Sequence, residues 1–168
     1  MNIIKLQSQS NFFINILSRQ VRRIEETGAI RRKDNEPECL EFLAVKSDKT
    51  EDYFRNIKSK KIAEVIWDGS VYKKIKYIFA ETPVIIYFSN PDNFGINQII
   101  RTGDAEFRAM ILKALRQRGY YLSSEKYLEK HSNDYLRNQD GKLMATNEEI
   151  DIFKLSGLTY MKPERRKK

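Results

Sequence analysis

The sequence has few of the residues that build metal centres and disulfide frameworks. It contains one cysteine, Cys39, and one histidine, His131, among 168 residues. A single cysteine forms no intrachain disulfide, and one of each residue cannot supply the four ligands of a structural zinc site. A Ser-His-Asp arrangement would depend on His131, which lies in a polar stretch that we expect to be a loop. These counts exclude a disulfide-stapled or zinc-stabilised fold and disfavour a serine hydrolase.

Long hydrophobic runs are lacking too. No stretch approaches the roughly 18 consecutive apolar residues of a membrane span, and Met1 to Ser10 lack the basic-then-apolar layout of a secretory signal. No long helical pattern pairs a basic face with an exposed apolar one, which argues against a membrane-surface protein. We therefore expect an intracellular protein without a membrane partner, in the cytoplasm or nucleus of a host cell or in a virion.

The residues that are present predict an α+β fold. Hydrophobic residues make up 40% of the chain, and nine phenylalanines and nine tyrosines can fill a core. In the first half, apolar spacing predicts helices over 11–24 and 52–57, and Asp68-Gly69 is typical of a tight hairpin. The predicted strands cover 39–45, 61–67, 75–79 and 84–88, forming a mostly antiparallel or mixed sheet with helices.

The second half changes character after a loop at Asn90-Pro91-Asp92. Residues 94–100 suit a short helix, and Asp104 suits the N-cap of a longer helix that Gly119 ends. The remaining expectations are small strands over 120–143, a capping box of Thr146 and Glu149 for a helix ending near Leu155, and a loosely ordered tail after Pro163.

Positive charge is in excess, with a formal net charge of +8. Basic residues gather in three places, and a clustered basic surface favours an acidic partner such as nucleic acid. The first cluster is Arg22, Arg23, Arg31, Arg32 and Lys33; the second is Arg101, Arg108, Lys113, Arg116 and Arg118; the third is Arg165, Arg166, Lys167 and Lys168.

Two stretches carry recognisable motifs. The first is Gly28-Ala29-Ile30-Arg31-Arg32, followed by Cys39-Leu40-Glu41. The second includes Thr102-Gly103-Asp104, Glu148-Glu149-Ile150-Asp151-Ile152-Phe153 and Leu155-Ser156-Gly157-Leu158-Thr159-Tyr160. Both resemble the family X DNA polymerases (the DNA polymerase β family), which have Gly-Ser-x-Arg-Arg, then Asp-x-Asp, then a Thr-Gly-Ser helix and a Glu-Glu-x-Phe, Leu-Gly-Leu-x-Tyr signature.

The resemblance implies a palm and a thumb, without the family's lyase domain and fingers. Residues 1–89 would form a degenerate nucleotidyltransferase palm, and residues 90–168 a small α/β thumb subdomain with a basic tail. The small viral family X polymerase has this minimal architecture. The abundance of Asn, Lys, Ile and Tyr also suits an AT-rich viral or phage genome.

Catalysis in this family uses two metal ions about 3.5–4 Å apart, held by three carboxylates. Alternate residues of a strand share a face, so Asp-x-Asp presents two carboxylates together. Here the three positions are Cys39, Glu41 and Ile85, and only Glu41 offers the oxygen ligand that magnesium prefers. We expect no cofactor, or Mg²⁺ if the protein is active. Glu41 would then be the catalytic and metal-binding carboxylate, with Asp34, Glu36 or Glu38 as a substitute ligand from the loop.

The resemblance also implies nucleotide and DNA contacts. Gly28 and Arg32, with Arg31 between them, match positions that engage the incoming triphosphate, although the partner serine is Ala29. Thr102 and Gly103 match thumb positions near the nascent base pair. Neighbouring thumb positions depart from the family towards basic residues, which favours phosphate contacts independent of base sequence. The expected DNA-binding residues are Arg101, Arg108, Lys113, Arg116, Arg165 and Arg166.

Three functions remain open. The first is a catalytically inactive polymerase-like protein that binds DNA or other nucleic acid, as an accessory subunit beside replication, repair or transcription proteins. The second is an active gap-filling DNA polymerase with a rebuilt two-metal site. The third is a structural subunit of a larger complex, whose basic clusters meet an acidic protein or RNA. The missing carboxylates favour the first, so we lean towards a protein that is not an enzyme.

Overall fold

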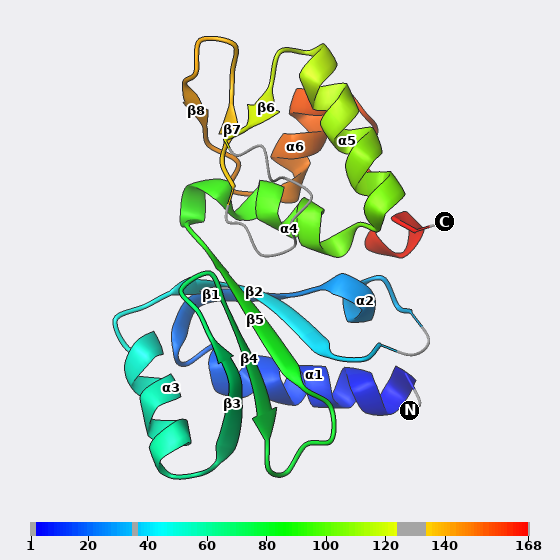
Figure 1. The fold of residues 1–168 in the computed structure, drawn as a ribbon. Helices are drawn as coiled ribbons and strands as arrows, with labels where there is room; N and C mark the ends of the chain where they lie inside the picture. Colours follow the sequence, from blue (N-terminus) through cyan, green and yellow to red (C-terminus); the bar gives the residue numbers. More distant parts are fainter. Residues whose placement is uncertain (1–2, 35–36, 124–133, 168) are drawn as a thin grey trace. The chain divides into compact units, whose positions relative to one another are not determined.

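The computed structural model describes residues 3–34, 37–123 and 134–167. Glu36 and His131, which entered the predictions above, lie outside these ranges. The chain divides into two compact units, Met1–Ser89 and Asn90–Lys168, and the α+β class expected from the sequence is confirmed (Figure 1). Over the described ranges, every helix is too short or too polar to cross a membrane.

The first unit contains a five-stranded mixed sheet in the order β1-β2-β5-β4-β3 (Figure 1). Strands β2 and β5 run parallel, and the other neighbouring strands run antiparallel. The helices are α1 (Ile3–Leu17), α2 (Gly28–Arg31) and α3 (Thr50–Ser59), and the strands are β1 (Val21–Thr27), β2 (Leu40–Lys46), β3 (Ala63–Asp68), β4 (Tyr72–Tyr77) and β5 (Val84–Ser89).

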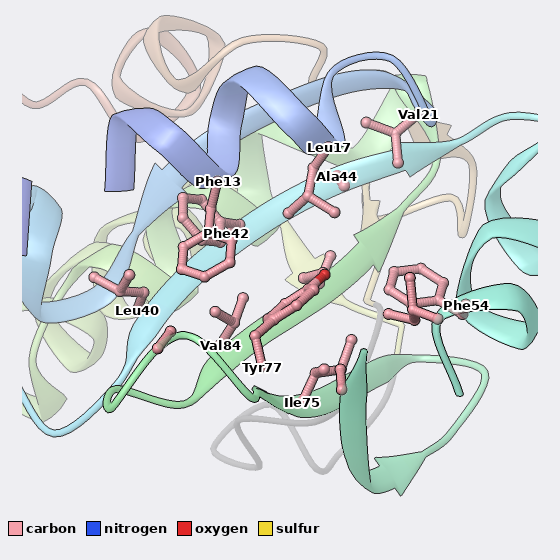
Figure 2. Close-up of a cluster of buried hydrophobic side chains, with 14 of the residues drawn as sticks. Phe13, Leu17, Val21, Leu40, Phe42, Ala44, Phe54, Ile75, Tyr77 and Val84 are labelled. Atoms are coloured by element: carbon pink, nitrogen blue, oxygen red, sulfur yellow. The ribbon is translucent and has the colours of Figure 1, made fainter. Parts of the chain in front are cut away.

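Helices α1 and α3 cover one face of this sheet. Alternate residues of a strand point to the same side, so Leu40, Phe42 and Ala44 of β2 all enter the core beneath the helices. Figure 2 shows Phe13 and Leu17 of α1 over this strand, with other core side chains from α3, β4 and β5 around them. The alternate residues of β2, including Glu41, point to the opposite face of the sheet.

Some predicted boundaries in this unit are wrong. The helix expected over 11–24 is α1, which ends at Leu17, and residues 21–27 form strand β1. Their apolar spacing fits a helix, but long-range pairing with β2 decides their conformation. The strand expected from Cys39 begins at Leu40. The Asp68-Gly69 hairpin is confirmed, because it joins β3 to β4.

In its described residues, the second unit packs three α-helices with a small antiparallel sheet in the order β6-β7-β8. Asp104 caps α5 as expected: its side chain accepts a hydrogen bond of 2.8 Å from the Phe107 amide. The elements are η1 (Pro91–Asn93), α4 (Phe94–Thr102), α5 (Ala105–Gln117), β6 (Tyr121–Leu122), β7 (Leu136–Arg137), β8 (Leu143–Met144), α6 (Glu149–Ser156) and η2 (Pro163–Arg165).

The capping box predicted from Thr146 and Glu149 is wrong. The N-cap of α6 is Glu148, whose amide donates to Asp151 Oδ2 over 2.9 Å. The backbone of Thr146 is used elsewhere: its amide donates to the Asp92 carbonyl, and its carbonyl accepts from the Gly95 amide. These partners lie some fifty residues away along the chain, so a local motif search does not reveal them.

Candidate functional site

One row of residues crosses all five strands of the first unit, and we call it the central row. Each member is the register partner of the next, and partners on neighbouring strands point to the same face. Because Leu40 and Phe42 on either side of Glu41 point into the core, the row lies on the face opposite α1 and α3. From β1 to β3 the central row is Thr27, Glu41, Ile85, Lys74 and Trp67.

Glu41 is held tightly within this row. It is 7% exposed, and its Oε1 accepts a hydrogen bond of 3.1 Å from the Tyr87 hydroxyl. Gly28 lies against the other carboxylate oxygen: a β-carbon at Gly28 would be 1.7 Å from Glu41 Oε2. The carboxylate therefore fills the space above Gly28, where the family resemblance implies a phosphate of the nucleotide.

The residues of the site do not fit a pair of magnesium ions. Ile85 is the register partner of Glu41, so the third carboxylate position presents an alkyl chain on the same face. Lys74, the next member of the row, adds a positive charge to this face, which is unfavourable beside a pair of divalent cations. Cys39 stands before β2 and offers a soft thiol. Over the described ranges, no three His, Cys, Asp or Glu side chains gather as a metal site.

The two loop acids that the structure describes do not compensate for the missing ligands. Asp34 pairs with Arg32 at 2.5 Å, and Glu38 is exposed to solvent. Glu36 lies outside the described residues. Neither described acid joins Glu41 in a metal-binding group, so we derive no step through a metal ion.

The predicted nucleotide contacts divide between the two units. Gly28 has φ 63° at the start of α2, and Arg31 and Arg32 follow it, half-buried. Thr102 and Gly103 lie in the second unit, where Thr102 is fully buried. Gly103 has a packing role, because a β-carbon there would be 2.2 Å from the Phe107 ring. Of the predicted site residues, the structure brings Gly28 and Glu41 together.

The predicted DNA-binding residues fall into two groups, because some are exposed to solvent and others are buried. Lys113 and Arg116 lie on the exposed side of α5, and Arg165 is exposed in η2. Arg108 is half-buried, with Nη1 3.4 Å from the Ile100 carbonyl oxygen. Arg101 is only 3% exposed, so it is not an open phosphate contact. Lys113, Arg116 and Arg165 remain as the surface cations of the predicted set.

Arg166 is a structural residue, which corrects its predicted place in the DNA-binding set and the expectation of a loose tail. Its guanidinium is fully buried and binds both carboxylate oxygens of Glu149, at 2.5 and 3.1 Å. It also donates to the Met161 carbonyl. Three aromatic rings surround it at 5.4–5.5 Å: Phe107, Phe153 and Tyr160.

Sequence reasoning missed the aromatic residues of this sheet face. Trp67 stacks on Tyr72 with ring centroids 5.8 Å apart and an interplanar angle of 13°. Tyr72 contacts Tyr87 at 5.8 Å, which in turn binds Glu41. The signal was present: the chain's one tryptophan directly precedes the Asp68-Gly69 turn. Without the strand register, however, nothing placed it in line with Glu41.

Comparisons with known proteins agree with this architecture. Residues 98–167 match the family model described as DNA polymerase beta thumb. The fold is similar to the crystal structure of Leishmania infantum polymerase beta in a ternary P/T complex, with a TM-score of 0.72 and 14% sequence identity. That match covers 99% of this chain and 76% of the Leishmania chain. No curated protein sequence matches significantly. The chain therefore has a family X polymerase-like α+β fold, similar to the palm and thumb of polymerase β, and residues 98–167 match the polymerase β thumb.

Proposed function

We propose that this protein is a catalytically inactive relative of the family X polymerases that binds DNA and serves as an accessory subunit in replication, repair or transcription. The similar Leishmania protein is a polymerase captured in a ternary P/T complex, which supports DNA as the ligand. The central row carries the proposal of inactivity. Where the chemistry needs three carboxylates, the row has one, followed by an isoleucine on the next strand and a lysine on the strand after it.

The position of Glu41 supports the same conclusion. Its carboxylate bonds to Tyr87 and lies on Gly28, so it occupies space that a nucleotide phosphate would need. A carboxylate there would also repel the phosphate, because like charges at contact distance are unfavourable. The palm is thus retained as a scaffold, and binding is assigned to basic surfaces.

Exposed cations of the second unit are the proposed DNA surface. Lys113 and Arg116 lie one turn apart on α5, so their side chains share a side of that helix. Arg165 and Lys167 line a hollow of about 290 Å³ beside the first turns of α5. Asp104 and Glu106 also line it, so the cations towards the end of α5 are the better test.

The test is binding and primer extension on a one-nucleotide-gapped duplex. We expect salt-sensitive binding by fluorescence anisotropy, and no extension with magnesium or manganese. Lys113→Glu with Arg116→Glu should reduce the slope of log affinity against log salt by about 1.8. Lys142→Glu with Lys154→Glu is the matched control, because it lowers the net charge equally at exposed sites that are not on α5.

Two outcomes would contradict the proposal. Equal loss of binding in both charge-reversed pairs would mean that net charge acts, and not a surface on α5. Extension that disappears in Glu41→Ala would show a working polymerase with a rebuilt metal site, which is the alternative function.

A further inference from the structure

The end of the central row carries an unusually placed tryptophan. Trp67 lies on the edge strand β3 and is 53% exposed. Its register partner is Lys74, so the two residues are cross-strand neighbours on the face opposite the helices. Lys74 makes no ion pair over the described ranges. A ring and a cation in this arrangement are the two elements that recognise a base and its phosphate.

The indole is fixed in place before any ligand binds. It stacks on Tyr72 at 5.8 Å, and Tyr72 contacts the buried Tyr87. Gly69 leaves room for it, because a β-carbon there would be 2.5 Å from Trp67 Nε1. The Gly69 amide donates to the Tyr72 carbonyl and closes the turn beneath the ring. An exposed ring held in this way loses little conformational entropy when a base stacks on it.

The charge of the segment that carries Trp67 favours an anionic partner. Residues 58–76 carry six lysines against two acids. Of those acids, Asp68 is bound to Lys73, which belongs to the core side of the sheet. The other, Glu64, is the register partner of Lys76, which leaves Lys74 as the cation next to the indole. A hydrophobic protein segment would use the ring but would gain nothing from these lysines.

We propose that Trp67, supported by Tyr72 and flanked by Lys74, is a stacking site for single-stranded DNA. A base lies on the exposed indole, and Lys74 contacts the adjoining phosphate. This inference rests on the proposed function and deepens it: the first unit binds unpaired nucleotides, separately from the duplex-binding cations of α5.

Binding at Trp67 can be followed by its fluorescence, because the chain has one tryptophan. We expect titration of the full chain with an oligothymidylate of about ten nucleotides to quench the indole emission, with a salt-dependent midpoint. Anisotropy with a labelled oligonucleotide should show Trp67→Ala binding about tenfold more weakly. Trp67→Phe should retain part of the affinity. Lys74→Gln should reduce the salt slope by about 0.7, which is the value for one phosphate of a single strand.

Phe79→Ala is the matched control, because Phe79 is 55% exposed on the same unit but lies outside the central row. It should bind as wild type. The inference is overturned if the emission stays unchanged while anisotropy shows the oligonucleotide bound, or if Trp67→Ala and Phe79→Ala weaken binding equally. Gapped-duplex binding separates the two proposals. If neither the wild type nor any variant binds the gapped duplex, but the oligothymidylate still quenches the indole emission, then the proposed function is contradicted and the stacking site is not.

Discussion

At the scale of the residue, Glu41 has changed its role without leaving its position. It is the one carboxylate left of the three expected, yet its oxygens are directed to Tyr87 and to the backbone at Gly28. A buried acceptor with a dedicated donor stabilises a fold, because leaving either partner unmatched costs about 1–3 kcal/mol. We therefore interpret Glu41 as a packing residue of the palm.

Replacing Gly28 tests this interpretation. Gly28→Ala should lower the free energy of unfolding by about 3 kcal/mol, because φ 63° disfavours a side chain and the new methyl group overlaps the Glu41 carboxylate. The measurement is urea unfolding of both single variants and the double variant with Glu41→Ala. Glu41→Ala should cost less in the Gly28→Ala background than alone. Equal costs would mean that the two residues are independent.

At the scale of the element, sequence reasoning succeeded where the deciding partners are local. The Asp104 cap was predictable, since the carboxylate and the Phe107 amide are three residues apart. Strand β1 was not predictable, because Val21 and Ile24 suit a helix equally well until β2 pairs with them. The central row follows from the same long-range register. The sequence could therefore name Glu41 and Ile85 but could not place Lys74 and Trp67 beside them.

An ion-pair cluster joins α3 to the β3–β4 hairpin and should make stability depend on acid. The hydrogen bond from Lys73 lowers the pKa of Asp68, against a smaller effect of burial. Burial raises the pKa of Glu51, but Lys46 and Lys73 together outweigh it and lower that pKa. Both carboxylates therefore stabilise the fold above their ordinary pKa values of 3.8 and 4.5, and lose this contribution as the pH falls through the lower folded-state values.

Lys73→Met should make the free energy of unfolding less dependent on pH in the acid range. Urea unfolding between about pH 6 and pH 2 should show a shallower acid loss in Lys73→Met than in wild type. Lys60→Met is the control, because Lys60 is exposed at the end of α3 and should leave the curve unchanged. Parallel curves for wild type and Lys73→Met would show that the cluster does not couple folding to protonation.

At the scale of the whole molecule, the excess of basic residues predicted an anionic partner. It did not predict which of these residues are exposed to bind that partner. Arg165 and Arg166 are adjacent in sequence, yet the first is exposed and the second is fully buried against Glu149. Sequence motifs and composition do not distinguish them, because the difference arises from three aromatic rings and a carboxylate that lie outside the basic tail. Each unit also has a separate hydrophobic core, so the buried pair belongs to the second unit alone.

This separation predicts that damage to one core stays local. Glu149→Ala leaves the Arg166 guanidinium buried without its carboxylate, which should cost about 3–5 kcal/mol. Native-state hydrogen exchange should then show faster exchange in α4, α5 and α6, with the amides of β2 and β5 protected as in wild type. Asp52→Ala, which removes the exposed partner of Arg55, should change neither unit measurably. Equal loss of protection in both units would mean that the two units unfold together, and that Glu149 and Arg166 stabilise the molecule as one cooperative fold.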